Sequence, residues 1–170
     1  MDIKRIIVGD LEENCYLLIK KNECVIVDPG DEFEKIKKEV GNLKVVGCLI
    51  THFHQDHIGA LEEVISKYDV SVNKVDSKEF TYEIIETPGH TSESKVFYFP
   101  KEKIMLTGDF LFKESFGRTD LGGNNKDMID SLNVIEKYSN DITIYPGHGE
   151  ESNLGVEKQH FVYYKRWLEK

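Results

Sequence analysis

Long hydrophobic runs and paired cysteines are both scarce in this sequence. The first apolar run, Ile6 to Val8, is far too short for a signal peptide or a membrane span. The cysteines Cys15, Cys24 and Cys48 are odd in number, lie in apolar stretches and do not have the spacing of a zinc–thiolate site. We therefore expect reduced, buried thiols in a cytoplasmic protein that has no membrane partner.

Basic residues are outnumbered by acidic ones: the sequence has 22 Lys and Arg and 31 Asp and Glu, which gives a formal net charge of −9. An acidic surface repels phosphate backbones, and no segment carries a basic cluster, so we expect no nucleic-acid partner. The 170 residues are enough for one domain with a sizeable core and too few to predict two. Without a repeat or linker to divide them, residues 1–170 are predicted to form a single domain, whose oligomeric state the sequence leaves open.

Hydrophobic patterning predicts a mixture of strands and helices. The expected strands are 3–8, 15–19, 24–27, 45–50, 80–86, 94–99, 103–107 and 142–145, the first three forming an antiparallel meander. The expected helices are 32–40, 58–68, 126–138 and 157–168, and residues 51–57 are expected to form a loop. This order indicates an α+β fold with helices packed on sheets, and leaves open whether there is one sheet or two.

Candidate reactive residues follow four of these expected strands. The first group lies within six residues, directly after strand 45–50, and comprises His52, His54, Asp56 and His57. The others each sit on a short turn after a later strand, and they are His90, Asp109 and His148. Turns at strand ends are where a rigid scaffold usually presents functional groups. Of the six histidines, only His160, in the last expected helix, stands apart.

These residues have the donor types of a metal site. In an extended loop, residues two apart point to the same side, so His52 and His54 can reach one ion, while Asp56 and His57 can face a second. Asp109 can bridge two cations and lower their net charge. The dense string His52 to His57 favours metal binding by itself. Each of the later turns alone is better explained as a structural turn, but in combination with that string they too favour metal binding. Nitrogen and oxygen ligands suit zinc, iron or manganese, and we expect two transition-metal ions, zinc first.

Two such ions can hold a shared water as hydroxide near neutral pH and can polarise a carbonyl group. We therefore expect hydrolysis of an acyl or phosphoryl bond in a small-molecule substrate, with Asp56 and Asp109 as the catalytic carboxylates. No Gly-x-Ser-x-Gly nucleophile motif and no glycine-rich phosphate loop offers a competing chemistry.

Four motifs resemble those of the metallo-β-lactamase superfamily, in the family's order: Thr51-His-x-His-x-Asp-His57, Pro88-Gly-His-Thr91, Gly108-Asp-x-Leu-Phe112 and Pro146-Gly-His-Gly149. Asn14 to Leu17 and Val27 to Gly30 are similar to its N-terminal strands. The resemblance implies an αββα sandwich with the metals at one edge. It places His52, His54 and His90 on the first metal, and Asp56, His57 and His148 on the second. It makes Asp109 the bridge between the two metals. It makes Asp28 a supporting residue near residues 51–57, which we call the metal loop.

Phe116-Gly-Arg-Thr-Asp-Leu121 resembles the glyoxalase II-like branch, especially its short bacterial members, which implies hydrolysis of glutathione thioesters. Arg118 and Asp120 are as well explained by a salt bridge that shapes the loop. The nearby Phe110, Phe112 and Phe116 are expected in the core.

Full-length glyoxalase II has a C-terminal helical domain that contacts glutathione, whereas about twenty residues follow His148 here. The segment between His57 and His90 is also short. We therefore expect that domain to be missing and the preference for the glutathione moiety to be small.

Three alternatives remain. Persulfide dioxygenases share the fold and Gly-Arg-Thr-Asp, and resemblance to them would place one iron on His52, His90 and Asp109. Their last motif typically reads Pro-Ala-His, unlike Pro-Gly-His148, and the full set of seven ligands favours two metals. A nuclease of the same fold is disfavoured by the acidic charge. A metal-binding module without turnover is the third alternative.

Overall fold

The computed structural model describes residues 1–170, and the chain divides into two compact units, Met1–Thr81 (unit 1) and Tyr82–Lys170 (unit 2). Each unit combines one five-stranded sheet with helices, which confirms the predicted mixture of strands and helices. The prediction of a single domain remains a prediction. None of the helices has the length and apolar character needed to cross a membrane.

The sheet of unit 1 has the order β1-β2-β3-β4-β5. Its strands are β1 (Asp2–Val8), β2 (Glu13–Lys20), β3 (Glu23–Val27), β4 (Lys44–Leu49) and β5 (Lys74–Val75). The first three form the predicted antiparallel meander, whereas β4 runs parallel to β3. The carboxyl ends of β3 and β4 therefore lie at the same edge of the sheet.

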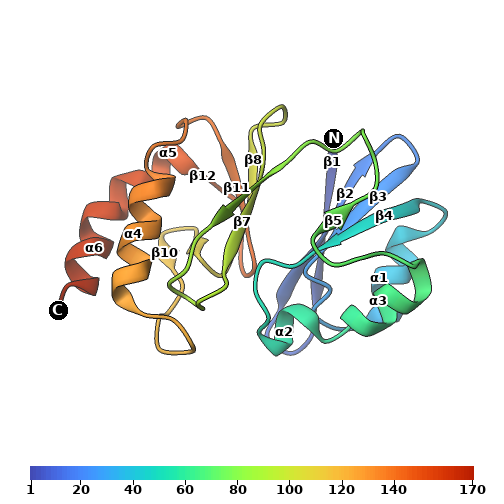
Figure 1. The fold of residues 1–170 in the computed structure, drawn as a ribbon, viewed down its shortest axis with the longest axis horizontal. Coiled ribbons are helices and arrows are strands. Elements are labelled where there is room, and N and C mark those ends of the chain that lie inside the picture. Colours follow the sequence, from blue (N-terminus) through green and yellow to red (C-terminus); the bar gives the residue numbers. More distant parts are fainter. The chain divides into compact units, whose positions relative to one another are not determined.

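The helices of unit 1 are α1 (Phe33–Val40), α2 (Gln55–Ile58) and α3 (Leu61–Tyr68) (Figure 1). Helices α1 and α3 bury Ile36 and Val64 in one hydrophobic cluster with residues from alternate positions of the strands, such as Leu17 and Ile26. This spacing places one face of each strand on the helices. All three cysteines are free and buried in this unit, as predicted.

The main sheet of unit 2 has the order β12-β11-β8-β7-β6. Its strands are β6 (Glu83–Glu86), β7 (Lys95–Phe99), β8 (Ile104–Gly108), β11 (Thr143–Pro146) and β12 (Ser152–Asn153). A separate two-stranded pair consists of β9 (Leu111–Phe112) and β10 (Ser115–Phe116). Strands β8 and β11 are parallel neighbours, although a long stretch of chain separates them.

The helical elements of unit 2 are α4 (Asn125–Ile135), α5 (Leu154–Glu157), the 3₁₀ helix η1 (Lys158–His160) and α6 (Phe161–Leu168) (Figure 1). Helix α4 begins where the Asn124 side chain accepts a hydrogen bond from the Asp127 backbone N–H, a standard N-cap. Met128 of α4 and Phe161 of α6 pack in one core cluster with Met105 of β8.

Several predicted boundaries were wrong. The expected helix 157–168 is interrupted by η1, and α4 ends at Ile135 rather than at residue 138. The expected loop 51–57 contains the first turn of α2, and the expected strand 80–86 begins only at Glu83. The strands β5, β9, β10 and β12, each of two residues, were not predicted, because two residues are too few to show an alternating pattern.

Candidate metal centre

The support for the metal loop of unit 1 comes from the parallel pairing of β3 and β4. Val27 pairs with Leu49, and the Asp28 backbone N–H donates to the Leu49 carbonyl at 2.9 Å. Asp28 and Thr51 therefore leave the sheet side by side. Thr51 donates to the Asp28 carboxylate twice, from its backbone N–H at 2.7 Å and from its hydroxyl at 2.6 Å.

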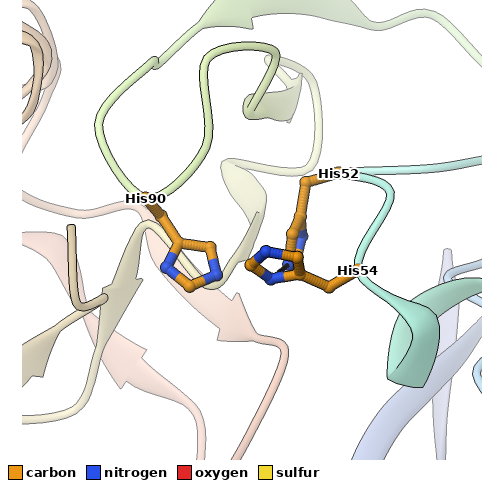
Figure 2. Close-up of side chains that lie close together, drawn as sticks. All are labelled: His52, His54 and His90. Carbon is orange, nitrogen blue, oxygen red and sulfur yellow. Dashed lines mark hydrogen bonds between the residues drawn. The ribbon is translucent and has the colours of Figure 1, made fainter. Parts of the chain in front are cut away.

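His52 and His54 lie on the segment that links β4 to α2 (Figure 2). His52 is buried, His54 is partly buried, and Phe53 between them points to solvent with 46% of its surface exposed. His52 Nε2 lies 3.1 Å from His54 Nδ1. Two ligand nitrogens, each about 2.1 Å from one ion, are separated by about 3.0–3.4 Å, so these two rings are spaced as ligands of a common cation.

Asp56 and His57 occupy the first turn of α2, and His57 Nε2 lies 3.7 Å from Asp56 Oδ2. The other ring nitrogen of His57, Nδ1, lies 2.9 Å from Asp28 Oδ2. This hydrogen bond to a buried carboxylate places the proton on Nδ1 and leaves the Nε2 lone pair for a cation. Asp28 has a positive φ of 48°, a backbone conformation unusual for a residue with a side chain and maintained here by its hydrogen bonds.

Gly30 lets the turn after β3 pack tightly against α2. A Cβ atom added at Gly30 would lie 1.8 Å from the Asp56 carbonyl oxygen. The Ala60 backbone N–H also donates to the Pro29 carbonyl at 2.9 Å. The Asp-Pro-Gly turn therefore fixes the backbone that carries Asp56 and His57.

In unit 2, the parallel pairing of β8 with β11 delivers Asp109 and His148 to one edge of the sheet. Gly108 pairs with Pro146, and the Gly147 backbone N–H donates to the Gly108 carbonyl at 2.9 Å. Asp109 Oδ2 lies 3.6 Å from His90 Nε2 and 3.7 Å from His148 Nε2. One carboxylate oxygen thus lies between two imidazole nitrogens.

The turn with His90 (Figure 2) is held by the backbone of the Gly-Arg-Thr-Asp segment. His90 Nδ1 donates to the Arg118 carbonyl oxygen at 2.7 Å, which leaves Nε2 free of its proton. A Cβ atom added at Gly117 would lie 1.8 Å from the Asp109 carbonyl oxygen, so this segment also packs closely on Asp109.

The side chains of Arg118 and Asp120 form a bidentate ion pair, with both nitrogen–oxygen distances at 2.6 Å. The guanidinium group lowers the pKa of Asp120 to about 2, and both side chains are 64% exposed. Of the three phenylalanines expected in the core, Phe110 is buried, but Phe112 and Phe116 are only partly buried because they lie in the β9–β10 pair at the surface.

The structure thus groups the predicted residues within each unit. Unit 1 brings together His52 with His54 and Asp56 with His57, and unit 2 brings His90 and His148 to Asp109. The nitrogen and carboxylate donors are those that zinc, iron and manganese accept. His160 contributes to neither group, because it precedes α6 and stacks on Tyr164 with ring centroids 6.0 Å apart.

Sequence analysis missed one residue at the edge of the unit 1 sheet from which the metal loop leaves. Glu13 opens β2, is buried with 1% of its surface exposed, and has its Oε1 3.6 Å from His57 Nδ1. An acidic residue at the start of the apolar run Cys15 to Ile19 was the available signal, because a carboxylate is rarely buried without a charged or polar neighbour.

Comparison with known proteins places these features in a family. The profile described as "Metallo-beta-lactamase superfamily" matches residues 8–81 and 74–148. The "Probable metallo-hydrolase YqgX" of Bacillus subtilis (strain 168) is 30% identical, over 93% of this chain and 95% of that protein. The "Hydroxyacylglutathione hydrolase GloC" of Haemophilus influenzae is 28% identical, over 94% of this chain and 96% of that protein.

Solved structures agree with this assignment. The B3 metallo-beta-lactamase BLEG-1 is similar with a TM-score of 0.88 and 28% identity, over 96% of this chain and 99% of that one. TTHA1623, solved in a di-iron-bound form, has a TM-score of 0.81 and 28% identity, over 91% of this chain and 96% of that one. The predicted α+β class and family are therefore confirmed: the chain belongs to the metallo-beta-lactamase superfamily and has its fold.

Proposed function

We propose that this chain is a two-metal hydrolase that cleaves thioesters of the hydroxyacylglutathione type. The observation that carries the proposal is the position of Asp109, whose Oδ2 lies 3.6 Å and 3.7 Å from the Nε2 atoms of His90 and His148. A carboxylate oxygen between two imidazoles is suited to neighbouring cations. The relative named hydroxyacylglutathione hydrolase, which matches along nearly its whole length, supports the choice of substrate.

The ligand assignment follows the family motifs. In this proposal His52, His54 and His90 would hold the first ion, Asp56, His57 and His148 would hold the second, and Asp109 would be a ligand shared by both. Within unit 1, the 3.1 Å separation of the His52 and His54 ring nitrogens fits a shared ion. Zinc suits this donor set, and the di-iron form of a related structure supports iron as the alternative. Two such ions, when bound, lower the pKa of water and polarise a carbonyl group.

Residues of the chain have separate roles in the proposed reaction. Asp28 and the Arg118 carbonyl orient His57 and His90 by accepting hydrogen bonds from their Nδ1–H groups. Asp56 is partly exposed, with 24% of its side chain accessible, so we assign its carboxylate to accept a proton from the attacking water. The water oxygen bonds to the thioester carbon, the carbon–sulfur bond breaks, and the proton passes to the departing thiolate. The products are a carboxylic acid and a free thiol.

The test compares kcat/KM for lactoyl thioesters of glutathione, N-acetylcysteamine and 2-mercaptoethanol, with released thiol as the readout. We expect turnover of all three and about two metal ions per chain by elemental analysis. A preference for glutathione above about a hundredfold, or roughly 2.7 kcal/mol, would show a dedicated thiol pocket and refute the expected small preference. Absence of hydrolysis, with one iron bound and oxygen consumed on a persulfide, would overturn the proposed activity in favour of a dioxygenase.

A further inference from the structure

The buried cluster of Glu13, Asp28 and His57 lies within unit 1, and its ligand-type atoms are all within 4.8 Å of one another. His57 Nδ1 is 2.9 Å from Asp28 Oδ2 and 3.6 Å from Glu13 Oε1. The side chains are almost fully buried, with exposed fractions of 0% for His57, 1% for Glu13 and 3% for Asp28. Two carboxylates therefore face one nitrogen of a single imidazole ring.

The position of Glu13 is set by the sheet. Strand β2 runs antiparallel to β3, so the start of β2 lies at the edge where β3 ends and Asp28 leaves the sheet. A Cβ atom added at Gly30 would lie 2.5 Å from Glu13 Oε2, which shows that the carboxylate packs directly on the turn after β3. Glu13 is thus held against the same turn that supports α2.

Asp28 accepts the hydrogen bond from His57 Nδ1 and two more from Thr51, and Glu13 is a second carboxylate beside the same ring nitrogen. A separation of 3.6 Å is too long for a hydrogen bond, so an influence of the Glu13 carboxylate on the His57 ring is electrostatic. A second negative group beside Nδ1 favours the tautomer that carries its proton there. It also disfavours the flipped ring, which would present a C–H edge to both carboxylates.

We propose that Glu13 is a positioning residue that fixes the tautomer and orientation of His57, so that the Nε2 lone pair faces Asp56. This proposal deepens the proposed two-metal function, in which His57 and Asp56 share the second ion. Its expected consequence is tighter binding of that ion. An outer carboxylate that orients a histidine ligand typically changes metal affinity by about tenfold to a hundredfold.

The first experiment reads the tautomer of His57 by ¹⁵N NMR in metal-free protein at a pH where the ring is neutral. We expect the wild type to carry the proton on Nδ1 and Glu13→Gln to show a mixture or broadening from exchange. Glu12→Gln is the matched control, because it removes the same charge one residue away from an exposed side chain. An Nε2–H tautomer in the wild type, or an unchanged signal in Glu13→Gln, would overturn the proposal.

The second experiment measures zinc affinity by competition with a chromophoric chelator. We expect Glu13→Gln to weaken one of two ions by about tenfold, Glu13→Asp to recover part of the loss, and Glu12→Gln to match the wild type. Equal affinities in Glu13→Gln and wild type would contradict the role, and a third tightly bound ion would show that the cluster is itself a metal site. If thioester turnover fails while the tautomer result holds, only the proposed function is lost.

Discussion

The close packing of Gly30 on the metal loop makes Gly30→Ala an informative perturbation. The added Cβ would lie 1.8 Å from the Asp56 carbonyl oxygen and 2.5 Å from Glu13 Oε2, whereas ordinary contacts begin near 3.4 Å. Because the nearest atom belongs to the backbone, the turn and α2 must separate by more than about 1 Å. Overpacking of this kind typically costs about 1–3 kcal/mol of stability.

Gly30→Ala should impair metal binding and turnover more strongly than it lowers the free energy of unfolding. Ligand distances in metal sites tolerate about 0.2 Å, so a shift of the Asp56–His57 backbone by about 1 Å disrupts their geometry. A misplacement of that size can also cost about a hundredfold in rate. We expect kcat/KM for a thioester to fall by about a hundredfold, and zinc affinity to fall for one of the two ions.

The assay combines denaturant unfolding of metal-free protein, chelator competition and thioester turnover. Gly41→Ala is the matched control, because Gly41 has a positive φ of 57° but its nearest neighbour would be 3.9 Å from an added Cβ. The control therefore introduces backbone strain without a clash and should retain both metal affinities. The reasoning would be refuted if Gly30→Ala bound both ions as tightly as the control and turned over substrate at the wild-type rate.

Three further predictions concern other features. Asp109→Asn keeps the shape of the side chain but removes its charge, so turnover should fall at least a hundredfold with loss of metal; a near-normal stoichiometry by elemental analysis would contradict the bridging role. Burial raises the pKa of the Cys24 thiol to about 12, so a thiol reagent should titrate no cysteine in native protein near pH 8 and all three after unfolding. Arg118 lowers the pKa of Asp120 to about 2, so this carboxylate should keep its charge until the pH falls through about 2. Any stabilisation from the pair is therefore present above the ordinary pKa of 3.8 and is lost as the pH falls through 2. Titration of the Asp120 carboxyl group near pH 3.8 by NMR would show that the pair opens in solution.

The strand ends were predictable from the sequence because they combine two strong signals. The apolar run before Thr51 predicts a buried strand, and the dense histidines after it predict a metal loop. The structure has β4 ending at Leu49 and the histidines directly beyond it. The grouping of His90 and His148 around Asp109 was predictable only through the family's motifs, because no short stretch of the sequence indicates that β8 and β11 pair.

The supporting contacts were harder to predict because they depend on long-range register. Glu13 reaches His57 only because β2 and β3 pair antiparallel and place a strand start beside a strand end. The Arg118 carbonyl that orients His90 is a backbone atom, so its residue type gives no indication of the contact. Sequence patterns therefore indicated the candidate ligands more directly than the contacts of Glu13 and of the Arg118 carbonyl.

The parallel pairing of β8 with β11 has a consequence for how such a protein can diversify. The chain between them, which includes the β9–β10 pair and α4, forms a crossover whose two ends are joined by the ladder and by the Gly147–Gly108 hydrogen bond. Insertions or deletions within that crossover, outside the Gly117–Arg118 backbone that contacts His90 and Asp109, can alter exposed segments while the sheet keeps Asp109 and His148 in place. The rest of the crossover can thus change in length without moving the strand ends that carry Asp109 and His148.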